Sequence, residues 1–209
     1  MKKKVIIGLV LAIPFISILF IILFRGILMP SNEEIINSLK KINNYEAKVQ
    51  YVIKNDKGEE TEETKQWYSA DKGVRVEFGD EVTKIYKDDN IYVKNNIKGN
   101  EYELNKDMDI VHPLAFINNI LSYPIKSESI SEGQEEWGET IYIKADLELF
   151  LNNAYFDKAT IFIDKKNKVP IGIIVYDKNN NYVLKIIYEQ FKKVDQIDDT
   201  LLWYWIKSY

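Results

Sequence analysis

The residues that could carry out chemistry are few, and the first is a lone histidine. His112 is the only histidine, and the chain has no cysteine. The missing thiols exclude disulfides, zinc–thiolate sites and thiol catalysis, and a catalytic or zinc-binding histidine needs partners that the composition does not supply. His112 also directly precedes Pro113 at an expected helix start. The sequence therefore favours a structural or surface histidine and predicts no metal ion and no cofactor.

Paired carboxylates are the second candidate. A glycoside hydrolase holds two acidic side chains roughly 5 to 9.5 Å apart across a cleft, so a peptidoglycan hydrolase is a remote alternative. The acidic pairs lie among lysines in expected turns and edge strands, where solvated charge is the simpler interpretation. There is no glycine-rich phosphate loop and no G-x-S-x-G motif. The sequence thus predicts that the protein is not an enzyme. The acidic pairs are Glu59 with Glu60, Glu62 with Glu63, Glu135 with Glu136, and Asp198 with Asp199.

Aromatic residues near the C-terminus form the third candidate. The segment Leu201–Ile206 follows the polar stretch Asp195–Thr200, and its alternation can bury one set of side chains while exposing the other. Core packing in an added strand is one interpretation. Contact with a partner or a membrane surface is the other, because exposed large aromatics often mark contact surfaces. The predicted contact residues are Trp203, Tyr204 and Trp205.

The N-terminal segment predicts a membrane anchor. Residues Val5–Phe24 are uncharged, and twenty helical residues would measure about 30 Å, the thickness of a bilayer core. Three lysines precede the segment and Arg25 follows it, which places the N-terminus in the cytoplasm. A cleaved signal peptide is the alternative, but its apolar region is shorter and ends in small residues. We therefore expect a single-pass membrane protein with an anchor over residues 1–29 and an extracytoplasmic domain over residues 30–209.

The start of this domain reads as a helix followed by a strand. Ser31 and Glu34 have the spacing of a capping box, and apolar residues at helical spacing follow over 35–42. From Tyr45 to Ile53 the period changes to two, which is typical of a half-buried strand. The polar segment 55–58 then turns the chain.

Short strands separated by turn residues recur along the rest of the chain. This rhythm predicts an antiparallel meander, because no long helix separates the strands. The apolar pattern of Ile110–Ser122 is instead helical. The further strands expected are Thr64–Ser69, Val74–Phe78, Val82–Tyr86, Ile91–Lys94, Thr140–Lys144, Lys158–Lys165, Val169–Tyr176 and Tyr182–Phe191.

The last third of the domain resembles LolA-type proteins. The resemblance lies in a strand ending in aspartate (Lys158–Asp164), a strand led by Pro170, the turn within Val175–Tyr182 and a final strand that ends at Phe191. The opening Ser31–Lys54 is also similar to the start of that family. The clostridial germination lipoproteins of the GerS type are the nearest members that we recognise. Their lipobox cysteine is absent here.

This resemblance implies a mainly-β (α+β) fold, a curved antiparallel sheet like an unclosed β-barrel with helices on its concave side. It also implies a binding scaffold, since LolA-type proteins carry lipids, related proteins sense them, and the germination type serves an N-acetylmuramoyl-L-alanine amidase in spore-cortex processing. The net charge is −4, although residues 1–25 contain only basic charges. The domain is therefore acidic, which argues against a nucleic-acid partner.

These observations predict a non-catalytic, membrane-anchored extracytoplasmic protein of a Gram-positive cell. We expect it to engage or activate a protein partner of the envelope or spore cortex, in a role related to germination. The amidase named above is the partner that the resemblance suggests. The alternative is a lipid- or lipoprotein-binding or sensing module that holds an acyl chain on the concave face.

Overall fold

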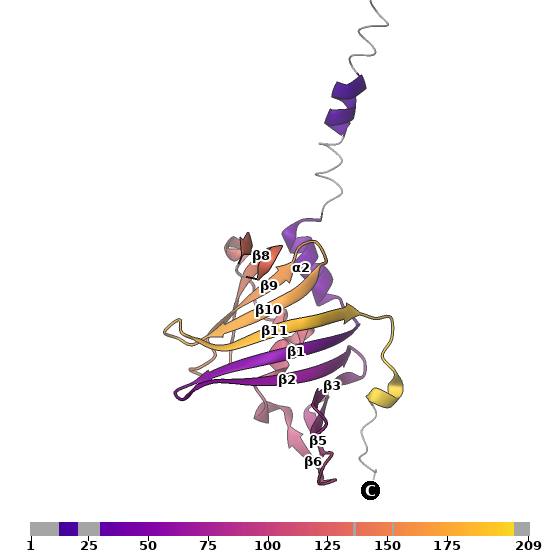
Figure 1. Cartoon of the computed structure of the whole chain (residues 1–209), viewed down its shortest axis with the longest axis vertical. Helices are drawn as coiled ribbons and strands as arrows, with labels where there is room; N and C mark the ends of the chain where they lie inside the picture. Colours follow the sequence, from indigo (N-terminus) through magenta and orange to yellow (C-terminus); the bar gives the residue numbers. More distant parts are fainter. Residues whose placement is uncertain (1–12, 21–29, 136, 152, 203–209) are drawn as a thin grey trace, which may run out of the picture.

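The computed structural model describes residues 13–20, 30–135, 137–151 and 153–202, and its main element is one large sheet (Figure 1). The order β6-β5-β4-β3-β2-β1-β11-β10-β9-β8-β7 runs from edge to edge without closing. This confirms the predicted mainly-β fold with a single unclosed antiparallel sheet. Its strands are β1 (Asn44–Asn55), β2 (Gly58–Ser69), β3 (Gly73–Phe78), β4 (Val82–Lys87), β5 (Asn90–Asn95), β6 (Glu101–Asn105), β7 (Ser131–Glu135), β8 (Gly138–Glu148), β9 (Lys158–Asp164), β10 (Val169–Tyr176) and β11 (Tyr182–Lys193).

Two runs of hairpins build the sheet and meet in its middle. Strands β1 to β6 pair consecutively, and so do strands β7 to β11. The first and last strands then pair with each other, from Tyr45 opposite Lys193 to Ile53 opposite Leu184. As a result the two free edges, β6 and β7, come from the middle of the chain.

The helix before the sheet, α2 (Asn32–Lys40), begins as the sequence predicts. The Ser31 side chain accepts a hydrogen bond from the Glu34 amide at 3.1 Å, and the Glu34 carboxylate accepts one from the Ser31 amide at 2.7 Å. This capping box satisfies two amides that the first turn leaves without partners. The apolar stripe of α2 is buried against the sheet through Ile35, Ile36 and Leu39.

The segment between the two runs of hairpins packs against the sheet. We call residues 110–125 the plug; it contains η2 (His112–Ala115) and α3 (Ile117–Ile120). The single helix predicted over Ile110–Ser122 is therefore divided at Phe116, whose backbone is extended. The plug and α2 share one apolar core with the strands around β1. Plug residues that are at most 1% exposed are Leu114, Ala115, Ile117, Ile120 and Leu121.

The sequence analysis did not predict β6 and β7, the two edge strands, and it predicted a β2 that is too short. Strands β6 and β7 are polar, because an edge strand outside the main core needs no strong apolar alternation. Strand β2 begins at Gly58 rather than near Thr64. Its first residues are exposed and carry glutamates, yet they pair with β1 in continuous register. Backbone pairing therefore extends the strand beyond the region that a buried face requires.

The prediction of a membrane-spanning helix is wrong for the described part of the chain. Over residues 13–20, 30–135, 137–151 and 153–202, no helix is long and apolar enough to cross a membrane. The localisation as a single-pass membrane protein with an extracytoplasmic domain is contradicted by this finding. Residues 5–12 and 21–24 of the expected span lie outside the described residues, and the division at residue 30 stays a prediction.

Candidate functional site

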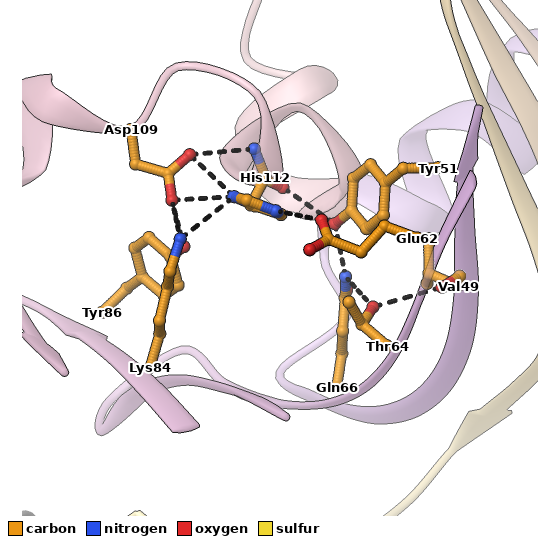
Figure 2. A network of polar contacts seen from close by, with 9 residues as sticks. All are labelled: Val49, Tyr51, Glu62, Thr64, Gln66, Lys84, Tyr86, Asp109 and His112. Carbon is orange, nitrogen blue, oxygen red and sulfur yellow. Dashed lines mark hydrogen bonds and ion pairs between the residues drawn. The ribbon is translucent and has the colours of Figure 1, made fainter. Parts of the chain in front are cut away.

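A cluster of charged side chains lies between the plug and the strands β2 and β4, with His112 at its centre (Figure 2). We call Glu62, Lys84, Tyr86, Asp109 and His112 the charged cluster. His112 is interior, with only 13% of its side chain exposed. The sequence assigned this residue a structural or surface role, and its surroundings are those of an interior histidine held by charges.

Each member of the charged cluster is positioned by its backbone element. Lys84 and Tyr86 lie two residues apart on β4 and so face the same side of the sheet. Glu62 faces the plug from β2. Asp109 follows η1 (Lys106–Met108), and its carboxylate accepts a hydrogen bond from the His112 amide at 3.2 Å. That bond holds the start of η2 and places the histidine ring between two carboxylates.

The imidazole ring bridges Asp109 and Glu62. Its Nδ1 lies 2.9 and 2.8 Å from the two Asp109 carboxylate oxygens, and its Nε2 lies 2.9 Å from Glu62 Oε2. Asp109 Oδ2 also accepts hydrogen bonds from Lys84 Nζ at 2.8 Å and from the Tyr86 hydroxyl at 2.6 Å. Both ring nitrogens therefore face a carboxylate, as expected of a charged imidazolium.

Neutral side chains extend this network toward the centre of the sheet. The Tyr51 hydroxyl donates to the His112 carbonyl at 3.2 Å and accepts from Gln66 Nε2 at 2.7 Å. The Thr64 hydroxyl donates to the Val49 carbonyl at 3.2 Å. The plug is thus attached to β1, β2 and β4 by polar bonds as well as by apolar packing.

The pKa values follow from this geometry. Burial by itself would lower the pKa of His112, but hydrogen bonds to Asp109 and Glu62 outweigh burial and raise it above 6.5. Burial would raise the pKa of Asp109, but its bonds to His112, Lys84 and Tyr86 hold that pKa well below the usual range. For Tyr86, burial and the Asp109 charge both raise the pKa of the hydroxyl. Both shifts favour the charged forms, which are the imidazolium of His112 and the carboxylate of Asp109.

This arrangement is suited to attaching the plug rather than to catalysis. A general base needs a free ring nitrogen that faces a nucleophile or a substrate proton. In the charged cluster both nitrogens contact acidic groups, and the remaining members are a lysine and a tyrosine. No group of three metal-ligating side chains is placed to hold a metal ion in the described residues.

A groove of about 400 Å³ opens beside the charged cluster and shares Tyr86 and Asp109 with it. Leu114 and Phe116 of the plug supply apolar lining. Gly73 is the first residue of β3 and has φ +108°, and a Cβ there would lie 2.3 Å from the Tyr86 carbonyl oxygen, so a larger residue would clash. The lining contains both acidic and basic side chains. Its other charged residues are Asp71, Lys72, Lys87, Asp88, Lys106 and Asp107.

The acidic pairs do not come together as a catalytic pair. Glu59 and Glu60 are exposed at the start of β2, whereas Glu62 turns inward to His112 and Glu63 turns outward. The interpretation as solvated charge did not include the contact of Glu62 with His112, although 42% of the Glu62 side chain is exposed. Glu136 lies outside the described residues.

The predicted contact residues Trp203, Tyr204 and Trp205 also lie outside the described residues, but the segment before them is well anchored. Lys72, at the rim of the groove, forms an ion pair with Asp199 of η4 (Asp199–Leu201), and Arg75 Nη1 donates to the Leu201 carbonyl at 3.0 Å. Leu202 is buried. The chain therefore reaches Trp203 from a position beside the turn between β2 and β3.

Sequence reasoning missed Asp109 and Lys84 altogether. The available signal was local: an aspartate three residues before a histidine that starts a helical turn can accept from the histidine amide. Nothing local indicates that Glu62, fifty residues away, lies against the same ring. That contact exists only because the plug crosses the face of β2.

Many solved structures are similar to this one. An uncharacterized conserved protein from Thermus thermophilus has a TM-score of 0.55 at 13% identity, over 84% of this chain and 94% of that chain. The LolA superfamily protein NE2245 from Nitrosomonas europaea has a TM-score of 0.45 at 10% identity, over 84% and 98%. A chain from the complex of the CwlD amidase with the GerS lipoprotein, from Clostridioides difficile, has a TM-score of 0.40 at 17% identity, over 78% and 89%.

The fold class is thus an unclosed antiparallel sheet that has LolA-like proteins among its structural neighbours. The sequence matches the family of sporulation protein YdcC-like proteins over residues 2–202, and the chain belongs to that family. No curated protein matches the sequence. The likeness to the GerS complex that the sequence suggested is a distant one, at 17% identity.

Proposed function

We propose that this YdcC-like chain is a non-catalytic binding protein of sporulation that engages a protein partner. The observation that carries the proposal is that the plug covers one face of the sheet with buried side chains. Leu114, Ile117 and Ile120 of the plug are at most 1% exposed and pack in one core with the sheet. Because the chain itself occupies this interior, we expect a partner to bind at the outer surface of the domain.

The charged cluster supports the non-catalytic part of the proposal. Asp109 and Glu62 engage both ring nitrogens of His112, and Lys84 and Tyr86 engage Asp109. Activating any of these groups for chemistry would leave a buried charge without its partner, which is strongly destabilising. The cluster is better explained as the attachment of the plug to the sheet.

The predicted contact residues Trp203 and Trp205 remain part of the proposal. Leu202, which directly precedes them in the sequence, is buried, and Asp199 forms an ion pair with Lys72 at the rim of the groove. The first partner to test is an N-acetylmuramoyl-L-alanine amidase of the spore cortex, because that is the partner the sequence resemblance implies. Aromatic side chains commonly dominate the binding energy of such contacts.

The proposal is tested by mixing the purified chain with a spore-cortex amidase from the same cells and measuring binding by calorimetry. We expect a stoichiometric complex that weakens at least tenfold, about 1.4 kcal/mol, when Trp203 and Trp205 are both changed to alanine. Phe150→Ala is the matched control, because Phe150 is an exposed aromatic on the other run of hairpins. Cross-linking in sporulating cells extends the search to other proteins. Failure to find any stoichiometric protein complex by either route would reject the proposal.

Lipid binding is a second candidate, favoured by the groove beside the charged cluster. Its volume of about 400 Å³ and its apolar lining from Leu114, Phe116 and Leu151 fall within the range of small-molecule sites. Mass spectrometry of organic extracts from the purified chain tests this function. A stoichiometric acyl lipid that disappears in a Leu151→Asp variant would support it, and an extract free of lipid would reject it.

A further inference from the structure

The two edge strands of the sheet, β6 and β7, differ in how well their backbone could pair with a further strand. At the β7 edge, a register shift lies between Gly133 and Glu135. Glu132 of β7 forms an ion pair with Lys165 and accepts a hydrogen bond from Asn32 of α2 at 3.0 Å. An irregular strand tied to neighbouring side chains is a poor template for another strand.

The β6 edge is regular. Strand β6 pairs with β5 without a register shift. Backbone hydrogen bonds of 2.9 Å lie at both ends of this pairing, from the Asn95 amide to the Asn100 carbonyl and from the Lys106 amide to the Asp89 carbonyl. In an antiparallel pair such bonded positions alternate with unbonded ones. The backbones of residues 102 and 104 therefore face β5, and those of Glu101, Glu103 and Asn105 face away from the sheet.

These three outward positions carry N–H and C=O groups with no backbone partner within the described residues. The side chains on the two faces of β6 are of different kinds. Glu101 and Glu103 lie on one face, where Glu101 pairs with Lys94 at 3.0 Å. Tyr102, half exposed, and Leu104 lie on the other face. The edge thus offers acidic groups on one side and apolar surface on the other.

Charge decides which kind of strand fits this edge. Two copies of β6 paired antiparallel about Glu103 would place glutamate opposite glutamate, which is destabilising. A strand that alternates lysine or arginine with apolar residues would instead place cations beside Glu101 and Glu103, and apolar side chains beside Tyr102 and Leu104. We propose that the β6 edge accepts an extended, alternately basic and apolar segment of a protein partner, which would add a twelfth strand to the described sheet. This inference rests on the proposed protein-binding function and names the chemistry of the partner.

The test uses the full chain and an acetylated, amidated peptide of alternating lysine and valine, followed by two-dimensional NMR titration. We expect shifts of the amides of residues 101, 103 and 105, and much weaker shifts with a peptide of alternating glutamate and valine. Equal binding of the two peptides would overturn the inference, and so would shifts confined to β7 or to the groove.

The sharpest variant is Glu103→Pro, with Glu103→Ala as its matched control. Both remove the charge, but only proline removes the outward N–H, and an edge strand tolerates proline at such a position. We expect the proline variant to bind the basic peptide about tenfold more weakly than the alanine variant, the value of a backbone hydrogen bond at the upper end of its range. Equal affinities would contradict edge pairing. If the proline variant does not fold by circular dichroism, the double variant E101K/E103K decides, because it should reverse the preference between the two peptides.

Different experimental results would reject the proposed function and the inference about the β6 edge. A stoichiometric complex with a whole protein partner that is unaffected by Glu103→Pro leaves the proposed function intact and rejects the β6 edge as the contact. Absence of any protein partner, together with no peptide binding, rejects both.

Discussion

Two parts of the sheet contact the plug in different ways. On the β1 and β8–β11 side, the plug and α2 pack in one apolar core that includes Tyr45, Ile161 and Ile173, all fully buried. On the β3–β6 side the apolar cluster is small, and the charged cluster takes over the contact with the plug. The same plug is therefore attached to one half of the sheet mainly by apolar burial, and to the other half by ionic hydrogen bonds together with the buried side chain of Phe116.

This difference indicates a division of roles. Apolar burial is insensitive to pH and determines the fold, whereas buried ion pairs add little net stability and depend on protonation. The groove and the open β6 edge both lie on the charged side. Both surfaces that we propose for recognition therefore lie on the side with the smaller apolar cluster, which agrees with the tendency of binding elements to come from regions of lower local stability.

The largest expected effect is at the apolar side. Ile120→Ala removes a fully buried plug side chain and leaves a cavity, so we expect the free energy of unfolding to fall by about 4 kcal/mol. Urea denaturation measures this. The control Ile141→Ala, at a half-exposed position of β8, should cost well under 1.5 kcal/mol. Similar losses at both positions would mean that the plug does not form the core.

A somewhat smaller loss is expected at the charged side. Asp109→Asn leaves Lys84 and the imidazolium without their common anion, at a cost of about 3 kcal/mol, the low end for a buried pair because Lys84 can reach solvent. Asp71→Asn, an exposed aspartate at the groove rim, is the control and should be nearly neutral. If Asp109→Asn were as mild as its control, the cluster would not hold the plug.

The free energy of unfolding should depend on pH through the charged cluster, and not through the apolar core. The pKa of His112 is raised in the folded protein, so its contribution is fully present below the unfolded value of about 6.5 and is lost as the pH rises through the folded pKa. The pKa of Asp109 is lowered, so its contribution is present above about 3.8 and is lost as the pH falls through the folded pKa. We expect stability to decline above neutral pH by about 1 to 2 kcal/mol, the value of a charge-assisted hydrogen bond.

Urea midpoints from pH 5.5 to 9 measure this decline. The variant His112→Gln cannot titrate in this range, and its stability should be nearly flat where that of the parent protein falls. A parallel decline in both proteins would assign the pH dependence to other groups.

The smallest effect is expected at the N-terminus of α2. Ser31→Ala removes one half of the capping box and should cost about 1 kcal/mol, because most of the stability of α2 comes from packing rather than from its cap. Thermal unfolding monitored by circular dichroism measures it, and Ser31→Asp should retain the parent stability. A loss as large as that of Ile120→Ala would contradict this ranking.

Local patterns were sufficient for the elements that bury one face. The capping box at Ser31 and the strands Val74–Phe78 and Val169–Tyr176 follow from residue spacing, because a half-buried strand or helix must alternate with its own period. The edge strands β6 and β7 were missed because they bury little. The membrane-spanning helix was expected from the same kind of local pattern, and the described residues contain no helix that could span a membrane.

The sequence by itself determined the antiparallel strand rhythm, the capped helix, the absence of thiols and the acidic domain. It could not place Glu62 and Lys84 around His112, since those contacts join residues fifty and twenty-eight positions apart. Only the tertiary structure decided them, because the pairing of β1 with β11 leaves the intervening chain to fold back over the sheet. That return brings the lone histidine, which has no partner of its own kind, between two carboxylates.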